Sequence, residues 1–138
     1  MQKSLFSYTL YQLDSTTGFL DRNGCLHMAD ELISRSRSSG QPLAALWVDL
    51  DRFKQINESC GYLGGDNFIA LIAKRLKEKF ANRAEFGRVG PDEFVCMVPN
   101  CDLHHAEQLS SEMMLSIAPE IDLGGFQYRP TASIGIAI

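Results

Sequence analysis

Residues 43–50 constrain the fold of this 138-residue chain more than any other segment. They read "LAALWVDL", a short and nearly continuous apolar run. Such a run predicts a strand that is buried on both faces, because a strand with one face in water alternates apolar and polar side chains. We therefore expect a sheet at the centre of the fold, with Trp47 in its core.

Amphipathic segments on either side of this strand predict the helices that pack on the sheet. Apolar residues recur at helical spacing over residues 22–38, 67–80 and 103–118. Directly after the central strand, residues 52–59 predict one or two helical turns, and residues 60–66 predict a glycine loop.

Four further strands complete the predicted sheet. Residues 84–89 and 94–98 flank a tight turn and predict a hairpin, and residues 125–128 and 131–138 predict a second pair of strands. The order helix, strand, helix, strand, strand, helix, strand, strand predicts an α+β fold. In such a fold a mixed, mainly antiparallel β-sheet is packed with helices, in the ferredoxin-like arrangement.

Composition narrows the classes of function. Thirteen basic and seventeen acidic residues give a net charge of −4 without a long run of either sign, which argues against a nucleic-acid-binding face but not against a small anionic ligand. No apolar run approaches the roughly 18 to 20 residues that span a bilayer, so we expect a cytoplasmic domain without membrane contact. The four cysteines lack zinc-ligand spacing, and we expect free, mostly buried thiols.

The two ends of the chain suggest a larger protein. Residues 132–138 read "ASIGIAI", an apolar strand-like run that reaches the last residue. An exposed apolar strand is an unfavourable place for a domain to end. We expect a leading helix or linker over residues 1–13 and a C-terminally truncated domain over residues 14–138.

Acidic residues lie at two predicted strand ends. Asp49 and Asp51 flank Leu50, so on an extended chain both carboxylates point to the same side. Two carboxylates and a carbonyl oxygen suit Mg²⁺, although the more ordinary explanation of Asp51 is that it caps the next helix. We assign helix capping to Asp51 and any metal to Asp49. Asp92 and Glu93 lie at the hairpin tip, where acidic turn residues are common.

Polar residues after the central strand suggest a ligand, but each has an ordinary explanation. Lys54 and Asn57 lie three positions apart, so they share a helix face that contacts either one ligand or solvent. The glycine loop ends at Asp66, which either reads the edge of a base or caps the following helix. None of these patterns is specific by itself.

The order of the motifs is specific, although each motif is weak alone. "DSTTGFLDR" at residues 14–22, "VDLDRFKQINESCGYLGGD" at residues 48–66, "RVGPDEF" at residues 88–94 and "ASIGIA" at residues 132–137 follow one another. This succession closely resembles the GGDEF family, the diguanylate cyclase domains that make cyclic di-GMP from two GTP molecules. The resemblance covers nearly the whole chain and implies a fold of the nucleotidyl-cyclase palm type.

The resemblance implies a metal site and a catalytic set. Asp49, the carbonyl oxygen of Leu50 and Asp92 would hold Mg²⁺ or Mn²⁺ together with GTP. Glu93 would assist at the metal or the phosphates, and Lys54 would contact the terminal phosphates. Metal charge and positioning would supply most of the acceleration.

The resemblance also implies how the nucleotide is held. Asn57 and Asp66 would read the guanine base beside Lys54, and Gly90 would let the backbone pass close to the phosphates. The reaction, attack of a 3′-hydroxyl on the α-phosphate of a second GTP, requires two domains that face each other. The implied partners are GTP, a second copy in a homodimer, and a neighbouring sensor or phosphodiesterase domain.

Pro91 is the main departure from the family pattern, because it stands where the family has its second glycine. Proline removes a backbone N–H and forbids the positive φ values that a Gly-Gly tip can adopt. The tip Gly-Pro-Asp-Glu therefore predicts a type I or type II turn. Loss of one donor of the oxyanion-hole kind typically costs about 3 to 4 kcal/mol, roughly 10² to 10³ in rate.

Three smaller departures accompany Pro91. Tyr62 replaces the histidine usual in the family's glycine loop, and the family's last helix, with its lysine and arginine, does not follow Ile138. The family's inhibitory Arg-x-x-Asp motif aligns with "ANRA" at residues 81–84, so we expect no allosteric inhibitory site there.

Three functions are compatible with the family resemblance and with these departures from it. The first is a degenerate GGDEF domain that binds GTP and regulates a neighbouring domain with little synthesis of its own. The second is an active diguanylate cyclase. The third is a dimerisation or interaction domain that needs no nucleotide.

Overall fold

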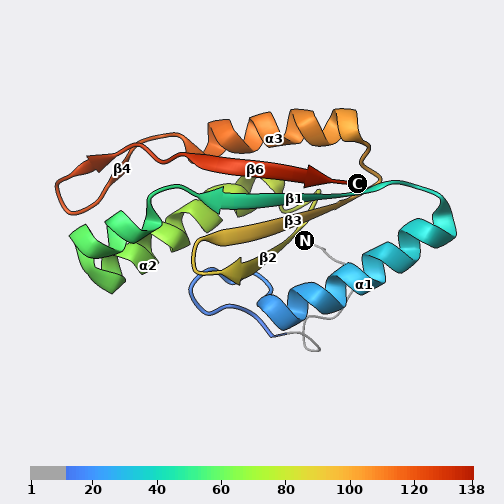
Figure 1. Ribbon diagram of the computed structural model, residues 1–138, viewed down its shortest axis with the longest axis horizontal. Helices are drawn as coiled ribbons and strands as arrows, with labels where there is room; N and C mark the ends of the chain where they lie inside the picture. Colours follow the sequence, from blue (N-terminus) through green and yellow to red (C-terminus); the bar gives the residue numbers. More distant parts are fainter. Residues whose placement is uncertain (1–11) are drawn as a thin grey trace.

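The computed structural model describes residues 12–138 (Figure 1), so the leading helix or linker expected over residues 1–13 lies almost wholly outside the described residues. The three helices are α1 (Arg22–Ser39), α2 (Phe53–Phe80) and α3 (Leu103–Ile117). The six strands are β1 (Leu43–Leu50), β2 (Glu85–Gly90), β3 (Glu93–Pro99), β4 (Ile121–Asp122), β5 (Gln127–Tyr128) and β6 (Ala132–Ala137).

Four of the strands form the central sheet, in the order β2-β3-β1-β6. Each neighbouring pair is antiparallel, and β1 lies between β3 and β6. The strand β1 has the bounds that its apolar run predicts. The α+β class, the mainly antiparallel sheet and the ferredoxin-like strand order are confirmed.

The prediction that the last two strands pair with each other is wrong. Strand β5 pairs with β4 in a separate two-stranded sheet, and β6 pairs with β1. Gly124 and Gly125 both have positive φ and close the β4–β5 hairpin locally. The apolar strand β6 then gains more burial beside the central strand than beside a two-residue strand.

Helices cover the two faces of the sheet unequally (Figure 1). Helices α2 and α3 share one core with the sheet, whereas α1 packs on the opposite face, mainly over β2 and β3. On the α1 side of β1, Leu43 packs under α1, but the second half of the strand is not covered, and Trp47 is 46% exposed. The prediction of a strand buried on both faces, with Trp47 in the core, is wrong because burial alternates along β1.

The glycine loop predicted over residues 60–66 is wrong in its length, because the only break is at Gly61, where two helical stretches meet to make up α2. The helix has 28 residues and is interrupted only by a kink at Gly61, whose φ of 75° and ψ of 174° are not helical. One glycine is enough to change the direction of the chain, since it adopts positive φ without steric cost. The second half of α2 buries the predicted apolar stripe of Phe68, Ile72, Leu76 and Phe80.

The remaining predictions concern the hairpin, the thiols and the membrane. Strands β2 and β3 form the predicted hairpin. All four cysteines are free; Cys60 is partly exposed and the other three are buried, as expected. No helix within residues 12–138 is both long enough and apolar enough to cross a bilayer.

Candidate functional site

Three elements meet at one end of the sheet and gather the predicted acidic residues (Figure 1). Strand β1 ends where α2 begins, and the β2–β3 turn lies beside this junction. Asp49 is the register partner of Glu93, and the backbone N–H of Leu50 donates to the carbonyl oxygen of Asp92 over 3.0 Å. Asp49, Asp92 and Glu93, which we call the acidic end, therefore lie at the same end of the sheet.

The hairpin tip has the geometry that proline favours. Gly90 pairs with Glu93, so Pro91 and Asp92 form a two-residue turn, and the register shifts between Arg88 and Gly90. Among the described residues other than glycine, only Arg52 and Asn100 have positive φ. A type II turn needs positive φ at Asp92, which leaves type I of the two predicted types. The register shift accommodates a turn whose twist fits a hairpin poorly.

Arg88 holds this tip from the side. Its guanidinium donates to the carbonyl oxygen of Pro91 over 2.7 Å and to that of Gly90 over 3.3 Å. It also forms an ion pair of 3.3 Å with Asp14. Sequence reasoning missed both residues of this pair, although each lies in a motif that carries the family resemblance.

Asp14 is saturated with hydrogen-bond donors. Its carboxylate accepts from the backbone N–H of Thr17 over 2.9 Å and from the Thr17 hydroxyl over 2.8 Å, besides the contact with Arg88. Burial acts to raise the pKa of Asp14, but these hydrogen bonds and the charge of Arg88 outweigh it and lower the pKa. The N-terminal turn thus anchors the hairpin through a carboxylate whose charged form is favoured by its surroundings.

Asp92 has the opposite environment. Burial raises the pKa of its carboxyl, the negative charge of Asp49 raises it further, and Arg88 opposes both only in part. A divalent cation bound between two carboxylates removes their mutual repulsion. Hard oxygen donors of this kind suit Mg²⁺ or Mn²⁺, so the residues present fit the predicted ion.

The acidic end does not form a complete metal-binding group by itself. Within residues 12–138, no three His, Cys, Asp or Glu side chains gather closely enough to hold an ion. An ion here would need other oxygen ligands, such as the Leu50 carbonyl and phosphate oxygens. This is the usual arrangement for Mg²⁺, which is bound through one or two carboxylates and its substrate's phosphates.

The β1–α2 junction corrects the assignment of Asp51 as a helix cap. The cap residue of α2 is Arg52, in the left-handed region with a φ of 63° and without a side-chain cap hydrogen bond. The Asp51 carboxylate instead accepts from the Thr131 hydroxyl over 2.7 Å. The N-terminus of α2 is left without a side-chain cap, and Lys54 lies exposed on its first turn.

Asn57 and Asp66 lie on the same helix, on either side of its kink. A Cβ atom at Gly65 would overlap the Asn57 amide, so this glycine makes room for that side chain. Asp66 is exposed within α2 and caps no helix, so helix capping does not explain this residue. A Cβ atom at Gly90 would similarly collide with the Glu93 carboxylate, so Gly90 gives space to a predicted catalytic group.

The predicted ligand-binding side chains share one property. In the described part of the chain they have no hydrogen-bond or ion-pair partner of their own; these residues are Asp49, Lys54, Asn57, Asp66 and Glu93. Other aspartates are engaged, since Asp21 and Asp102 cap helices and Asp122 closes a turn. Polar groups without partners beside an acidic end are available to a ligand.

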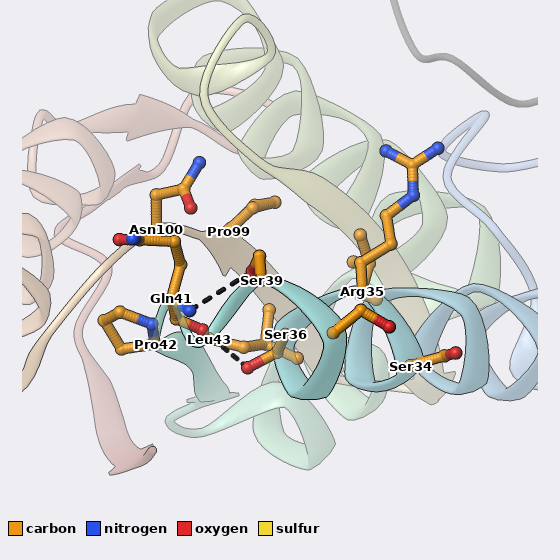
Figure 2. A pocket seen from close by; sticks show the side chains of 11 residues that line it. Ser34, Arg35, Ser36, Ser39, Gln41, Pro42, Leu43, Pro99 and Asn100 are labelled. Atoms are coloured by element: carbon orange, nitrogen blue, oxygen red, sulfur yellow. Dashed lines mark hydrogen bonds between the residues drawn. The ribbon is translucent and has the colours of Figure 1, made fainter.

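A cavity of about 420 Å³ lies elsewhere (Figure 2). Its walls come from the last turns of α1, the start of β1 and the end of β3, including Arg35, Ser39, Leu43 and Pro99. Leu43 and Asp49 stand at opposite ends of β1, so this cavity belongs to the far end of the sheet. It contains none of the predicted site residues.

The comparisons with known proteins agree with this geometry. The family model described as "Diguanylate cyclase, GGDEF domain" matches residues 11–138. The chain belongs to the GGDEF family. It is thus a GGDEF domain of cyclic di-GMP signalling.

Relatives of this GGDEF domain include proteins named for both directions of cyclic di-GMP turnover. Diguanylate cyclase DgcP of Escherichia coli is 33% identical over 131 residues, which cover 94% of this chain and 37% of that protein. Cyclic di-GMP phosphodiesterase NbdA of Pseudomonas aeruginosa is 30% identical over 125 residues, which cover 91% of this chain and 16% of that protein. The chain therefore spans only a minor part of these relatives.

Solved structures share the fold. A sensory box/GGDEF family protein from Caulobacter crescentus superposes with a TM-score of 0.83 at 29% identity, over 91% of this chain and 81% of that one. The palm-like arrangement implied by the resemblance is confirmed.

Proposed function

We propose that this GGDEF domain binds GTP with Mg²⁺ or Mn²⁺ and acts mainly as a regulatory module, with little synthesis of cyclic di-GMP. The observation that carries the proposal is the acidic end. Among residues 12–138, the carboxylates of Asp49 and Glu93 have no protein partner, and they lie beside a hairpin in which Pro91 replaces the family's second glycine. The first half of this observation favours nucleotide binding. The second half favours loss of synthesis.

Binding of the ion and the phosphates would use the β1–α2 junction. Asp49, the Leu50 carbonyl and Asp92 would hold the ion, which neutralises phosphate charge when bound. Lys54 would contact the terminal phosphates from the first turn of α2. The uncapped N–H groups of that turn add a partial positive charge, which favours an anion.

Recognition of the base would use the middle of α2. Asn57 offers an amide that both donates and accepts, and Asp66 offers a carboxylate that accepts from the N–H groups of guanine. Gly61 has no side chain and open space around it, which allows a flat base to approach the helix, and Gly65 leaves room for the Asn57 amide. We accordingly propose a preference for GTP over ATP.

Little synthesis is expected because of Pro91. A proline has no N–H, so the tip loses one donor that a Gly-Gly turn could aim at the phosphates. Removal of one such donor lowers a rate by roughly 10² to 10³ without unfolding the enzyme. Glu93 and Lys54, the proposed catalytic residues, are retained. We therefore expect Pro91 to lower the synthesis of cyclic di-GMP without abolishing the binding of GTP.

An active diguanylate cyclase is the second candidate, and the Arg88 contacts favour it. Arg88 fixes the carbonyl oxygens of Gly90 and Pro91, so the tip is held firmly despite the proline. In this case two copies, each with one GTP, would face each other so that one 3′-hydroxyl attacks the other α-phosphate. Residues 81–84 would provide no site for product inhibition.

Titration calorimetry and product analysis separate these functions. We expect heat of binding with GTP and Mg²⁺ but little cyclic di-GMP, measured by chromatography after incubation with GTP. Pro91→Gly is expected to raise synthesis by about 10² or more, with GTP affinity unchanged. Strong synthesis by the unaltered protein would establish the second candidate instead. No binding at millimolar GTP would leave only a dimerisation or interaction role.

A further inference from the structure

Asp51 is held by two residues that come late in the sequence. The Thr131 hydroxyl donates to its carboxylate over 2.7 Å, and the Asp51 N–H donates to the Thr131 carbonyl over 2.9 Å. The Tyr128 hydroxyl donates to the Asp51 carbonyl over 3.3 Å. We call Asp51, Tyr128 and Thr131 the Asp51 clasp.

The clasp is attached to the core. The Tyr128 ring packs edge-on against Phe68, with ring centroids 5.7 Å apart, and Phe68 is 1% exposed. The clasp therefore fixes Asp51 relative to the second half of α2. The Thr131–Asp51 side-chain bond itself is exposed, so the two hydrogen bonds to the Asp51 backbone and the packing of Tyr128 on Phe68 supply most of the rigidity.

The clasp maintains a backbone conformation that the sequence alone does not favour. Arg52, directly after Asp51, has a φ of 63° and a ψ of 22°, in the left-handed region that costs energy for residues other than glycine. Such a residue persists only where its surroundings over-determine it. Here the surroundings consist of the three hydrogen bonds of Asp51 and the bond from the Leu50 N–H to the Asp92 carbonyl. Together they hold Arg52 in this conformation.

The clasp also decides where one negative charge lies. Aspartate is among the residues most favoured as a helix cap, because its side chain accepts from the free N–H groups of the first turn. Asp51 is one residue away from that position in α2, yet its carboxylate is turned to Thr131. The same first turn carries Lys54 and is the proposed phosphate site. A freed carboxylate would compete for it as an acceptor and repel a phosphate.

We propose that Thr131 is a positioning residue for the nucleotide: its hydroxyl holds the Asp51 carboxylate away from the first turn of α2, so that this turn stays open to phosphates. The inference rests on the proposed function, because it concerns the same nucleotide. It adds Thr131, which lies 80 positions from Asp51 in sequence.

The test is the affinity of the 138-residue chain for GTP with Mg²⁺, measured by calorimetry, together with the urea midpoint of each variant. Thr131→Val removes the hydroxyl and keeps the shape. We expect it to weaken GTP binding about tenfold, the size of a charge effect at a helix end in favourable geometry. The urea midpoint should change little, because the hydrogen bonds of the Asp51 N–H and of the Tyr128 hydroxyl still hold the backbone at Arg52.

Three matched variants decide whether the carboxylate is responsible. Thr131→Ser keeps the hydroxyl and is expected to bind GTP like the wild type. Asp51→Ala alone is expected to bind at least as tightly as the wild type. Adding Asp51→Ala to Thr131→Val is expected to restore the lost affinity, which a merely collapsed junction would not allow.

The outcomes separate this inference from the function on which it rests. A wild-type chain that binds no GTP refutes the proposed function and the inference with it. Equal GTP affinity in the wild type and Thr131→Val refutes the inference alone. Weakened binding that Asp51→Ala does not restore, or a lowered urea midpoint with unchanged affinity, assigns Thr131 only a structural role and also refutes it.

Discussion

The N-terminal turn, residues 14–21, and the acidic end both place carboxylates beside the same hairpin, but the protein treats them in opposite ways. Asp14 accepts hydrogen bonds from Thr17 and Arg88, and its pKa is lowered. Asp92 lies beside the like charge of Asp49, and its pKa is raised. The first region uses its charge to hold the fold. The second keeps its charge at a cost to stability, which is typical of functional sites.

The largest effect is expected from breaking the N-terminal turn at Arg88. Its side chain is 14% exposed and that of Asp14 is 22% exposed, so Arg88→Ala leaves a partly buried carboxylate without its cation and removes a side-chain donor from two hairpin carbonyls. We expect the free energy of unfolding to fall by about 2 to 4 kcal/mol, as for other largely buried pairs. Urea denaturation measures it.

A matched control exists on the surface. Arg129 and Glu120 form an ion pair of 3.0 Å whose side chains are 72% and 48% exposed. Arg129→Ala is expected to cost less than about 1 kcal/mol. Equal losses for Arg88→Ala and Arg129→Ala would mean that the N-terminal turn does not anchor the hairpin.

A smaller loss is expected when the Asp14 charge is removed. Because its folded-state pKa lies below the ordinary value of 3.8, its contribution to stability is present above that pH and is lost as the pH falls through the folded pKa. Asp14→Asn should lower the free energy of unfolding at pH 7 by about 1 to 2 kcal/mol. The loss should shrink below about pH 4, as the wild type itself protonates. Denaturation at several pH values measures this, and a pH-independent loss would contradict it.

The smallest effect, of opposite sign, is expected at Asp92. A raised pKa means that the folded state favours the protonated carboxyl, so this contribution to stability is present below the ordinary pKa of 3.8 and is lost as the pH rises through the folded pKa. Asp92→Asn should therefore raise the free energy of unfolding at pH 7 by about 0.5 kcal/mol. The exposed and unpartnered Asp66 serves as the control, since Asp66→Asn should change it little. A destabilised Asp92→Asn variant would show that the acidic end stabilises the fold.

Local patterns predicted most of the elements, and the family resemblance singled out the residues of the acidic end. The bounds of β1 follow from its apolar run, and Asp49 meets Glu93 because a short hairpin returns beside the central strand. Local patterns could not predict that α1 leaves Trp47 uncovered, because burial depends on where a distant helix packs. They also overestimated the length of the glycine loop, since a single kink at Gly61 is enough to change the direction of the chain.

Contacts between distant residues account for the rest. Asp51 was expected to cap α2, which is its best local option, and only the fold brings Thr131 to its carboxylate. Arg88 and Asp14 lie 74 positions apart, so no local spacing indicates that they meet. Both contacts place a charge through tertiary structure, and both lie next to the proposed nucleotide site.

The most direct test of the account is the thermal midpoint with and without GTP and Mg²⁺, for the wild type and for a variant that carries Asp49→Asn and Asp92→Asn. Without nucleotide, we expect the variant to melt at the same or a higher temperature than the wild type, because the repulsion at the acidic end is gone. With nucleotide, the wild-type midpoint should rise and that of the variant should not. An equal rise in both proteins, or a variant that is already destabilised without nucleotide, would contradict the claim that these carboxylates are kept for an ion and its nucleotide.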